Sequence, residues 1–135
     1  MLDRDLTFYV VDTHALYWYF EYPDLLSAAA DAVFRLVAAG GAQIVVPAIV
    51  IAEFYYLSQK AGPIIFPSSL LAQINVSREF IFSEMGQAQL ESMEAVTGVP
   101  EMHDRLITAE ALVYGAPVIS RDQALRASGV VDVIW

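Results

Sequence analysis

Four acidic residues stand at or near junctions between predicted strands and helices: Asp12, Glu53, Asp104 and Asp122. Each alone is typical of a helix cap, a first-turn acid or a partly exposed helix glutamate. Together, four carboxylates on one rim would repel one another and need compensation. Hard divalent cations take oxygen ligands, and with no cysteine and two histidines Mg²⁺ or Mn²⁺ fits better than zinc. Such a site suits phosphodiester hydrolysis, because the metal lowers the pKa of a bound water.

Asp12 ends the apolar run 8–11, and a helical pattern follows it at once. A short, wholly apolar run is typical of a strand buried on both faces of a parallel sheet. In open α/β sheets, ligands bind at the carboxyl ends of the strands. Glu53 lies one turn into the helix after the next strand, and helical side chains lean toward the helix N-terminus. We therefore expect Glu53 to point back toward Asp12.

The predicted helix 104–114 and the chain that returns after it bring two more acids to this edge. The helix is about 16 Å long at 1.5 Å per residue. The chain turns at Gly115, and the stretch 117–122 covers about 20 Å at 3.3 Å per residue. Asp104 and Asp122 should therefore finish at nearly the same level, at the carboxyl end of the sheet.

Strands and helices alternate along the whole chain. Strands are expected at 7–11, 43–46, 79–82, 117–120 and 131–134, and helices at 13–22, 27–39, 49–59, 68–75, 87–96, 104–114 and 123–127, with a loop at 99–103. This alternation predicts an α/β fold, a three-layer α/β/α sandwich around a central, mostly parallel five-stranded sheet. No linker or repeat divides residues 1–135, so we expect a single domain.

Composition narrows the class of protein. The hydrophobic fraction of 57% excludes a disordered chain, and the absence of cysteine excludes disulfides and thiolate metal sites. The longest apolar run, 44–52, is too short to span a bilayer, and the first six residues lack the basic start of a signal peptide. We therefore expect a cytoplasmic protein with no membrane association.

The net charge is −9, with one lysine and six arginines. An acidic chain gains little from attraction to phosphates, so a nucleic-acid binder with a broad basic patch is excluded. Acids gathered in one place could still hold cations that in turn hold phosphates. The high apolar fraction also indicates surface that a partner covers.

The chain resembles a PIN domain, the fold of many ribonucleases and of VapC-type toxins. The resemblance rests on Val11-Asp12-Thr-His-Ala-Leu-Tyr-Trp18, Ile51-Ala-Glu53, His103-Asp104-Arg-Leu-Ile107 and Gly115-Ala-Pro-Val-Ile-Ser120-Arg-Asp122, in this order and spacing. It implies metal ligands at the four acids and an active-site hydroxyl at Ser120 and at Thr13. Threonine is usual where Ser120 stands. The resemblance favours the toxin branch and implies an endoribonuclease, an RNA substrate, a small antitoxin partner and a homodimer.

Residues beside the acids have two interpretations each. Arg105 and Arg121 would anchor RNA phosphates or offset the charge of the acids. His14 and His103 are more typical of surface or packing positions, although His103 could contact a phosphate. The aromatic residues would stack on unpaired bases or form core and dimer contacts; they are Tyr17, Trp18, Tyr55 and Tyr56.

Other protein classes share parts of the pattern. A phosphatase of the haloacid dehalogenase type also places an aspartate between strand and helix, but it needs a second acid at position 14, which is His14, and a later lysine. The only lysine, Lys60, is poorly placed for that role and for a receiver domain, and an HD-type hydrolase needs more histidines. A non-catalytic interaction module with the PIN fold is the remaining alternative.

Overall fold

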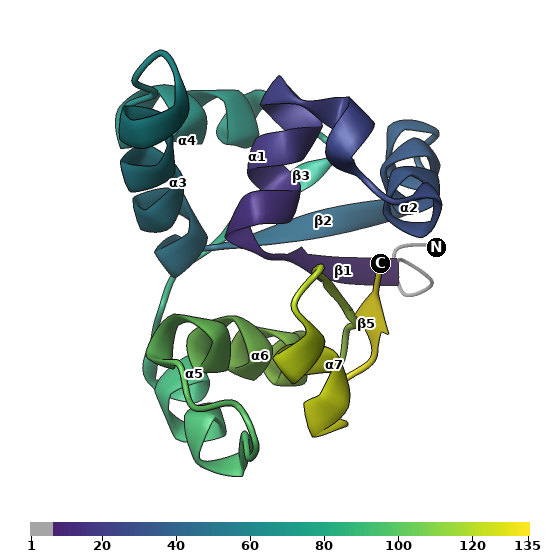
Figure 1. Cartoon of the computed structure of the whole chain (residues 1–135), viewed down its shortest axis with the longest axis vertical. Coiled ribbons are helices and arrows are strands. Elements are labelled where there is room, and N and C mark those ends of the chain that lie inside the picture. Colours follow the sequence, from purple (N-terminus) through teal and green to yellow (C-terminus); the bar gives the residue numbers. More distant parts are fainter. Residues whose placement is uncertain (1–6) are drawn as a thin grey trace.

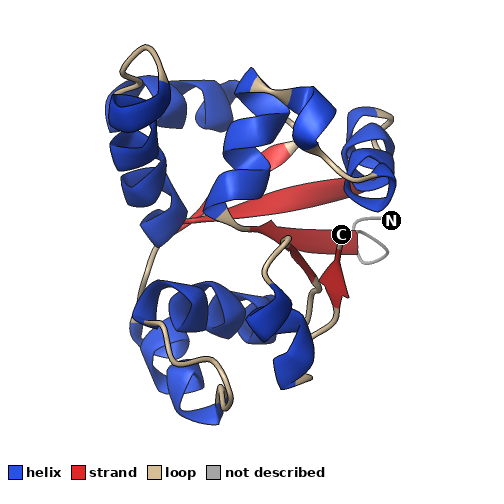
Figure 2. Cartoon of the chain, viewed as in Figure 1, coloured by secondary structure: helices blue, strands red, loops and turns tan. Residues whose placement is uncertain are grey.

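The computed structural model describes residues 7–135 and shows one parallel sheet between two layers of helices (Figures 1 and 2). The first six residues, in which the sequence lacks a basic start, lie outside the described part. The predicted α/β/α architecture is confirmed. The sheet has the order β3-β2-β1-β4-β5, so the chain starts at its centre, builds outward to one edge, and then crosses back to the other side.

Every strand pairing is parallel, where the sequence predicted a mostly parallel sheet. The strands are β1 (Thr7–Val11), β2 (Ala42–Pro47), β3 (Phe80–Ser83), β4 (Val118–Ile119) and β5 (Val133–Ile134). Their carboxyl ends face the same edge, because Val11 pairs with Ile119 and Pro47 pairs with Ser83. Whatever follows the central strands therefore meets at that edge.

The helices divide between the two faces of the sheet in chain order. In Figure 1, α1 (Thr13–Glu21), α2 (Ala28–Ala38), α3 (Ala48–Ala61) and α4 (Pro67–Val76) lie above the sheet; α5 (Gln87–Ser92), α6 (Met102–Tyr114) and α7 (Gln123–Ser128) lie below it. Two 3₁₀ turns, η2 (Pro23–Leu25) and η3 (Met93–Ala95), follow α1 and α5. Among residues 7–135, no helix is long and apolar enough to cross a membrane.

The central strands carry the core. Val10 and Val11 of β1 and Ile44, Val45 and Val46 of β2 are fully buried, on both sides of the pleat. Helices cover both faces of this sheet, so alternate residues face different helices and all must be apolar. The short apolar runs in the sequence therefore predicted these strands correctly.

Several boundaries differ from the sequence-based expectations. The helix expected to start at Asp104 begins at Met102, so His103 lies in the helix and not in a loop. Glu101 is the N-cap residue and accepts a hydrogen bond from the backbone N–H of Asp104. The helix expected to end at Val96 changes to the 3₁₀ turn η3 after Ser92, and β4 and β5 are two residues each. Local propensity alone does not determine such ends, because packing against neighbouring elements decides them.

A buried acid on α6 fixes the helices below the sheet. Glu110 is 2% exposed, and its Oε2 accepts hydrogen bonds from the Ser83 hydroxyl at 3.0 Å and from the Gln89 amide at 2.9 Å. The Gln89 Oε1 in turn accepts from the backbone N–H of Gly86. One carboxyl therefore joins α6 to the end of β3 and to α5.

We expect Gln89→Ala to lower the free energy of unfolding by about 1–3 kcal/mol, because it leaves a buried carboxyl oxygen with one partner fewer. The matched control is Gln87→Ala on the same helix. Gln87 donates only to the exposed Glu91, so its loss should cost about 0.5 kcal/mol or less. Urea unfolding of both variants measures the difference, and equal losses would contradict the proposed role of Glu110.

Candidate active site

An open pocket of about 730 Å³ is bordered by the residues that follow the carboxyl ends of the central strands. The four acids singled out in the sequence all line it: Asp12, Glu53, Asp104 and Asp122. They come from four separate elements, two on each face of the sheet: the caps of α1 and α7, the second turn of α3 and the first turn of α6. The sheet edge thus brings together residues up to 110 positions apart in the sequence.

Asp12 is the most deeply placed of these acids. It is the N-cap of α1, and its Oδ1 accepts the backbone N–H of Ala15 at 2.9 Å. Burial raises the pKa of the Asp12 carboxyl above its usual value, although hydrogen bonds from Ser120 and Ala15 act in the opposite direction. The helix N-terminus thus holds one carboxylate oxygen in place and partly compensates its burial.

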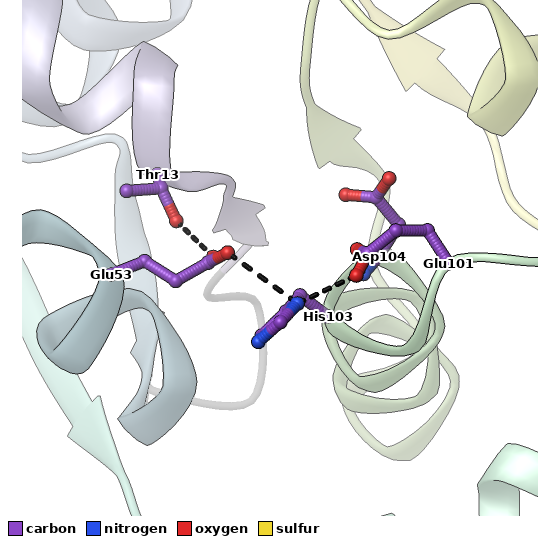
Figure 3. Close-up of polar contacts among 5 residues, drawn as sticks. All are labelled: Thr13, Glu53, Glu101, His103 and Asp104. Carbon is purple, nitrogen blue, oxygen red and sulfur yellow. Dashed lines mark hydrogen bonds and ion pairs between the residues drawn. The ribbon is translucent and has the colours of Figure 1, made fainter. Parts of the chain in front are cut away.

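Glu53 is linked to both sides of the pocket (Figure 3). Its Oε1 accepts a 2.6 Å hydrogen bond from the Thr13 hydroxyl on α1. Its Oε2 lies 3.9 Å from Nδ1 of His103 on α6. The same nitrogen donates to Oε2 of Glu101 at 2.6 Å. A polar chain from Thr13 to Glu101 therefore crosses from one helical layer to the other.

The hydrogen bond to Glu101 raises the pKa of His103 against the opposing effect of burial, and the nearby Glu53, Glu101 and Asp104 carboxylates act in the same direction as the bond. The charged imidazolium is therefore favoured at this position. The His103 side chain lies between Glu53 of α3 and the acids at the start of α6, where its positive charge offsets part of their repulsion.

Asp104, like Asp12, has a raised pKa. Burial raises its pKa to about 6, and the charges of Asp122, Glu101, Asp12 and Glu53 add to this shift. Asp104 is thus close enough to the other three acids for their charges to act on it. The convergence expected from helix and strand lengths is present in the structure.

Asp122 and Ser120 form the support on the β4 side. Asp122 is the N-cap of α7, where its Oδ1 accepts the backbone N–H of Leu125, and its own N–H donates to the Ser120 hydroxyl. Ser120 is fully buried and hydrogen-bonds Asp12, so it connects two of the acids from behind. This placement favours a positioning role for Ser120. Thr13, by contrast, lines the pocket itself.

The structure places Arg105 and Arg121 in different environments. Arg121 is exposed and lines the pocket, with its guanidinium carbon 5.6 Å from the centroid of the Trp18 ring. Arg105 is not among the pocket-lining residues, and its Nη2 donates to the carbonyls of Met93 and Val96 at 2.9 Å each. Arg105 therefore fixes the turn that leads out of α5.

Sequence reasoning gave little weight to two residues that the structure places at or beside the pocket, Lys60 and Glu101. Lys60 lines it, seven residues after Glu53 on the same face of α3. This spacing was a usable signal, since residues at i and i+7 share a helix face. Glu101 was missed because nothing in the sequence distinguishes it from Asp104 as the cap. Among the aromatic residues, Trp18 and Tyr56 line the pocket, while Tyr17 is buried core.

The donor set suits a hard divalent cation. It consists of carboxylate oxygens that repel one another, and a bound cation would reverse the raised pKa of Asp104. Within residues 7–135, no three acidic or histidine side chains are already grouped as a metal cage. The residues thus fit a Mg²⁺ or Mn²⁺ ion in chemistry, and binding would require side-chain rotation to draw the carboxylates together.

A family model for the PIN domain matches residues 9–129. The chain belongs to the PIN domain family. The match includes every acid of the pocket. No curated protein sequence matches this PIN domain.

Solved structures share its fold at low sequence identity. VapBC2 from Rickettsia felis, bound to a DNA fragment from its promoter, has a chain with a TM-score of 0.67 and 14% identity, covering 94% of this chain and 97% of the other. Mycobacterium tuberculosis VapC20, a sarcin–ricin loop cleaving toxin, has a TM-score of 0.66 at 18% identity, covering 94% and 99%. A toxin–antitoxin complex from Klebsiella pneumoniae gives 0.64 at 19% identity, covering 93% and 95%.

The raised pKa of Asp104 predicts how stability changes with pH in EDTA. A carboxyl with a folded pKa of about 6 and an ordinary unfolded value near 3.8 contributes stability below pH 4, and this contribution is lost as pH rises through 6. We therefore expect Asp104→Asn to have a higher melting temperature than the parent at pH 7.5. The gain in free energy of unfolding should be about 1 kcal/mol, after allowance for the partial exposure of Asp104. At pH 4 the difference should vanish.

The matched control is Asp24→Asn, which removes the same charge from an exposed position away from the pocket. Thermal melts of the three proteins from pH 4 to pH 8 measure the effect. A constant offset of Asp104→Asn across this range would contradict the raised pKa of Asp104 as its cause.

Proposed function

We propose that this PIN domain is a metal-dependent endoribonuclease that hydrolyses RNA phosphodiester bonds, and that it is the toxin of a toxin–antitoxin pair. The observation that carries the proposal is that four carboxylates from four separate elements line one open pocket. In this pocket the pKa of Asp104 is raised to about 6, first by burial and then by the charges of the neighbouring acids. Perturbed carboxyls in a cleft are typical of functional sites. Membership of the PIN domain family and structural likeness to a toxin that cleaves the sarcin–ricin loop support the same function.

In this proposal, Asp12, Glu53, Asp104 and Asp122 hold Mg²⁺ or Mn²⁺. When bound, the metal lowers the pKa of a water and offsets phosphate charge. The protein's own part is to aim the carboxylates. The Ala15 N–H fixes one oxygen of Asp12, the Thr13 hydroxyl fixes one oxygen of Glu53, and the Leu125 N–H fixes one oxygen of Asp122, so these three acids would each keep a second oxygen for the ion.

Residues beside the acids have separate tasks. Ser120 holds Asp12 and the backbone of Asp122 together, and Thr13 orients Glu53. Arg121 is the arginine that faces the pocket and is suited to an RNA phosphate, whereas Arg105 supports the turn at Met93. His103 occupies the space between Glu53 and Glu101, where it balances charge in the metal-free protein.

The alternatives have less support. The haloacid dehalogenase mechanism lacks its second acid at His14, and the chain belongs to another family. A non-catalytic module would have no need for four mutually repelling carboxylates, and their retention favours an enzyme.

Partners follow from the same likeness. Toxin–antitoxin complexes among the structural neighbours support a small antitoxin as partner. Exposed apolar residues at the α3–α4 corner support a homodimer; they are Ile64 and Phe66, at 50% and 55% exposure. The proposed compartment is the cytoplasm, where RNA is accessible.

We expect the protein to cleave RNA with Mg²⁺ or Mn²⁺, and EDTA, Asp12→Asn or Asp104→Asn each to abolish cleavage. Loss of one carboxylate removes a ligand and should lower the rate by at least about a hundredfold. Asp24→Asn is the charge-matched control and should retain activity. Gel assays with structured and single-stranded RNA measure the rates. Unchanged cleavage in EDTA or in either pocket variant would show that another chemistry operates.

Metal binding has a readout that does not depend on activity. Mn²⁺ at a hundredfold excess over its dissociation constant should stabilise the parent by about 2.7 kcal/mol. Asp104→Asn should gain less, because it has lost a ligand, while Asp24→Asn should gain as much as the parent. Equal gains in all three would remove Asp104 from the metal site.

We expect a homodimer in solution with the α3–α4 corner in its interface. Phe66→Glu should therefore produce monomers, since it places a charge in an apolar contact. Leu90→Glu, an equally exposed position on α5 in the opposite layer, is the control and should remain dimeric. Light scattering at micromolar concentration measures the masses. A monomeric parent would refute the dimer.

A further inference from the structure

A buried carboxyl lies in the middle of α6, outside the acidic pocket. Glu110 is 2% exposed and is not among the residues that line the pocket. A carboxyl in the interior carries a cost in desolvation unless hydrogen bonds compensate it, whereas an apolar side chain would carry none. Both donors to Glu110 bind the same oxygen, Oε2, at 3.0 Å from Ser83 and 2.9 Å from Gln89. The direction of this carboxyl is therefore fixed by β3 and α5 together.

Ser83 connects Glu110 to the strand from which α3 starts. Ser83 is the last residue of β3 and is paired in register with Pro47, the last residue of β2. Pro47 is also the N-cap residue of α3, the helix that carries Glu53. The Ser83 hydroxyl accepts a longer hydrogen bond, at 3.4 Å, from Tyr114, which lies one turn after Glu110 on α6. Helix α6 is thus attached at two points to the strand end beside the start of α3.

The attachment bears on the spacing between two acids of the pocket, Glu53 and Asp104. Their helices, α3 and α6, lie on opposite faces of the sheet (Figure 1). Within residues 7–135, the ion pair that joins these helices is the loose contact between Glu53 and His103, at 3.9 Å. Asp104 lies six residues before Glu110, about 9 Å along α6. Glu53 lies equally far along α3 from Pro47. A small tilt of α6 at Glu110 would therefore shift Asp104 relative to Glu53.

We propose that Glu110 is a positioning residue for the pocket: through Ser83 it holds α6 at the angle at which Asp104 and Glu53 can bind the same ion. The assignment rests on the proposed metal-dependent function. Ligands of a metal site must be held within about 0.5 Å of their working geometry, and buried hydrogen-bonded groups behind them supply that precision. The bond from Gln89 supports a different contact, since it leads to α5 and not to the start of α3.

Substitutions of the two donors separate positioning from stability. Ser83→Ala removes the bond from β3, while Gln89→Ala removes the bond from α5 and keeps the other. Each takes one donor from the same buried oxygen, so both should lower the melting temperature. We expect Ser83→Ala to weaken Mn²⁺ binding about tenfold and Gln89→Ala to change it less than twofold, measured by titration calorimetry well below the melting temperature of each protein. Equal losses of affinity would overturn the proposal, because affinity would then follow stability.

Substitutions of Glu110 itself provide a rescue by the conservative variant. Glu110→Ala should weaken Mn²⁺ binding at least about tenfold. Glu110→Gln keeps the length of the side chain, and its amide oxygen can accept both donors because they bind a single carboxyl oxygen. The affinity of Glu110→Gln should therefore stay within about threefold of the parent. A loss as large as in Glu110→Ala would show that the charge of Glu110 matters and not the position of α6, and this would overturn the proposal.

Crystal structures in EDTA test the positioning without the metal. In Ser83→Ala and Glu110→Ala, the separation between the Glu53 and Asp104 carboxyl groups should change by about 1 Å or more from the parent, and in Gln89→Ala it should not. An unchanged separation in the first two variants would refute positioning even if the parent binds Mn²⁺. A parent that binds no Mn²⁺, with a separation that depends on Ser83, would refute the metal-dependent nuclease and leave the positioning role standing.

Discussion

Repulsion among carboxylates at one edge of a parallel sheet is the constraint on which this structure depends. Parallel strands carry the chain to the same edge each time, so the residues after β1, β2 and β4 meet there. Asp12, Glu53 and Asp122 come from these junctions, and Asp104 joins them from the first turn of α6. Burial and the charges of these neighbours together raise the pKa of Asp104 to about 6, so its charged form is disfavoured there. A fold retains such a cost where the acids have a task, and cation binding is the task that oxygen ligands suit.

The surrounding structure tolerates the repulsion through backbone donors and hydroxyl groups. Helix N-termini face Asp12 and Asp122, Thr13 bonds Glu53, and Ser120 is buried between Asp12 and the Asp122 backbone. These contacts orient the carboxylates as well as stabilising their negative charge, because each contact to Asp12, Glu53 or Asp122 uses one oxygen of that acid. Farther away, Glu110 ties α6 to β3 and α5, so the helix that presents His103 and Asp104 has a rigid base. The pocket is therefore preorganised on its β1 and β4 side, while the contact between Glu53 and His103 at 3.9 Å is loose enough to rearrange.

The cations of the pocket complete the electrostatic arrangement in two different ways. His103 lies among the acids and offsets them, whereas Arg121 and Lys60 line the pocket and take part in none of the ion pairs within residues 7–135. The low overall content of basic residues means that few positions supply positive charge to the pocket.

The sequence by itself determined the features that depend on residues close together in the chain. Buried strands read as apolar runs because both faces of a parallel sheet are covered, and Asp12 and Asp122 cap helices because their side chains reach the next backbone donors. The convergence of the four acids followed from the ends of the strands, the lengths of the elements and the lean of helical side chains toward the helix N-terminus. Only the tertiary structure decided that Glu101, not Asp104, caps α6, that Ser120 is buried, that Arg105 faces away from the pocket, and that Lys60 faces into it. The physical reason is that a side chain's direction depends on how its helix is rotated and packed against other elements, and the sequence neighbours of a residue do not determine that rotation.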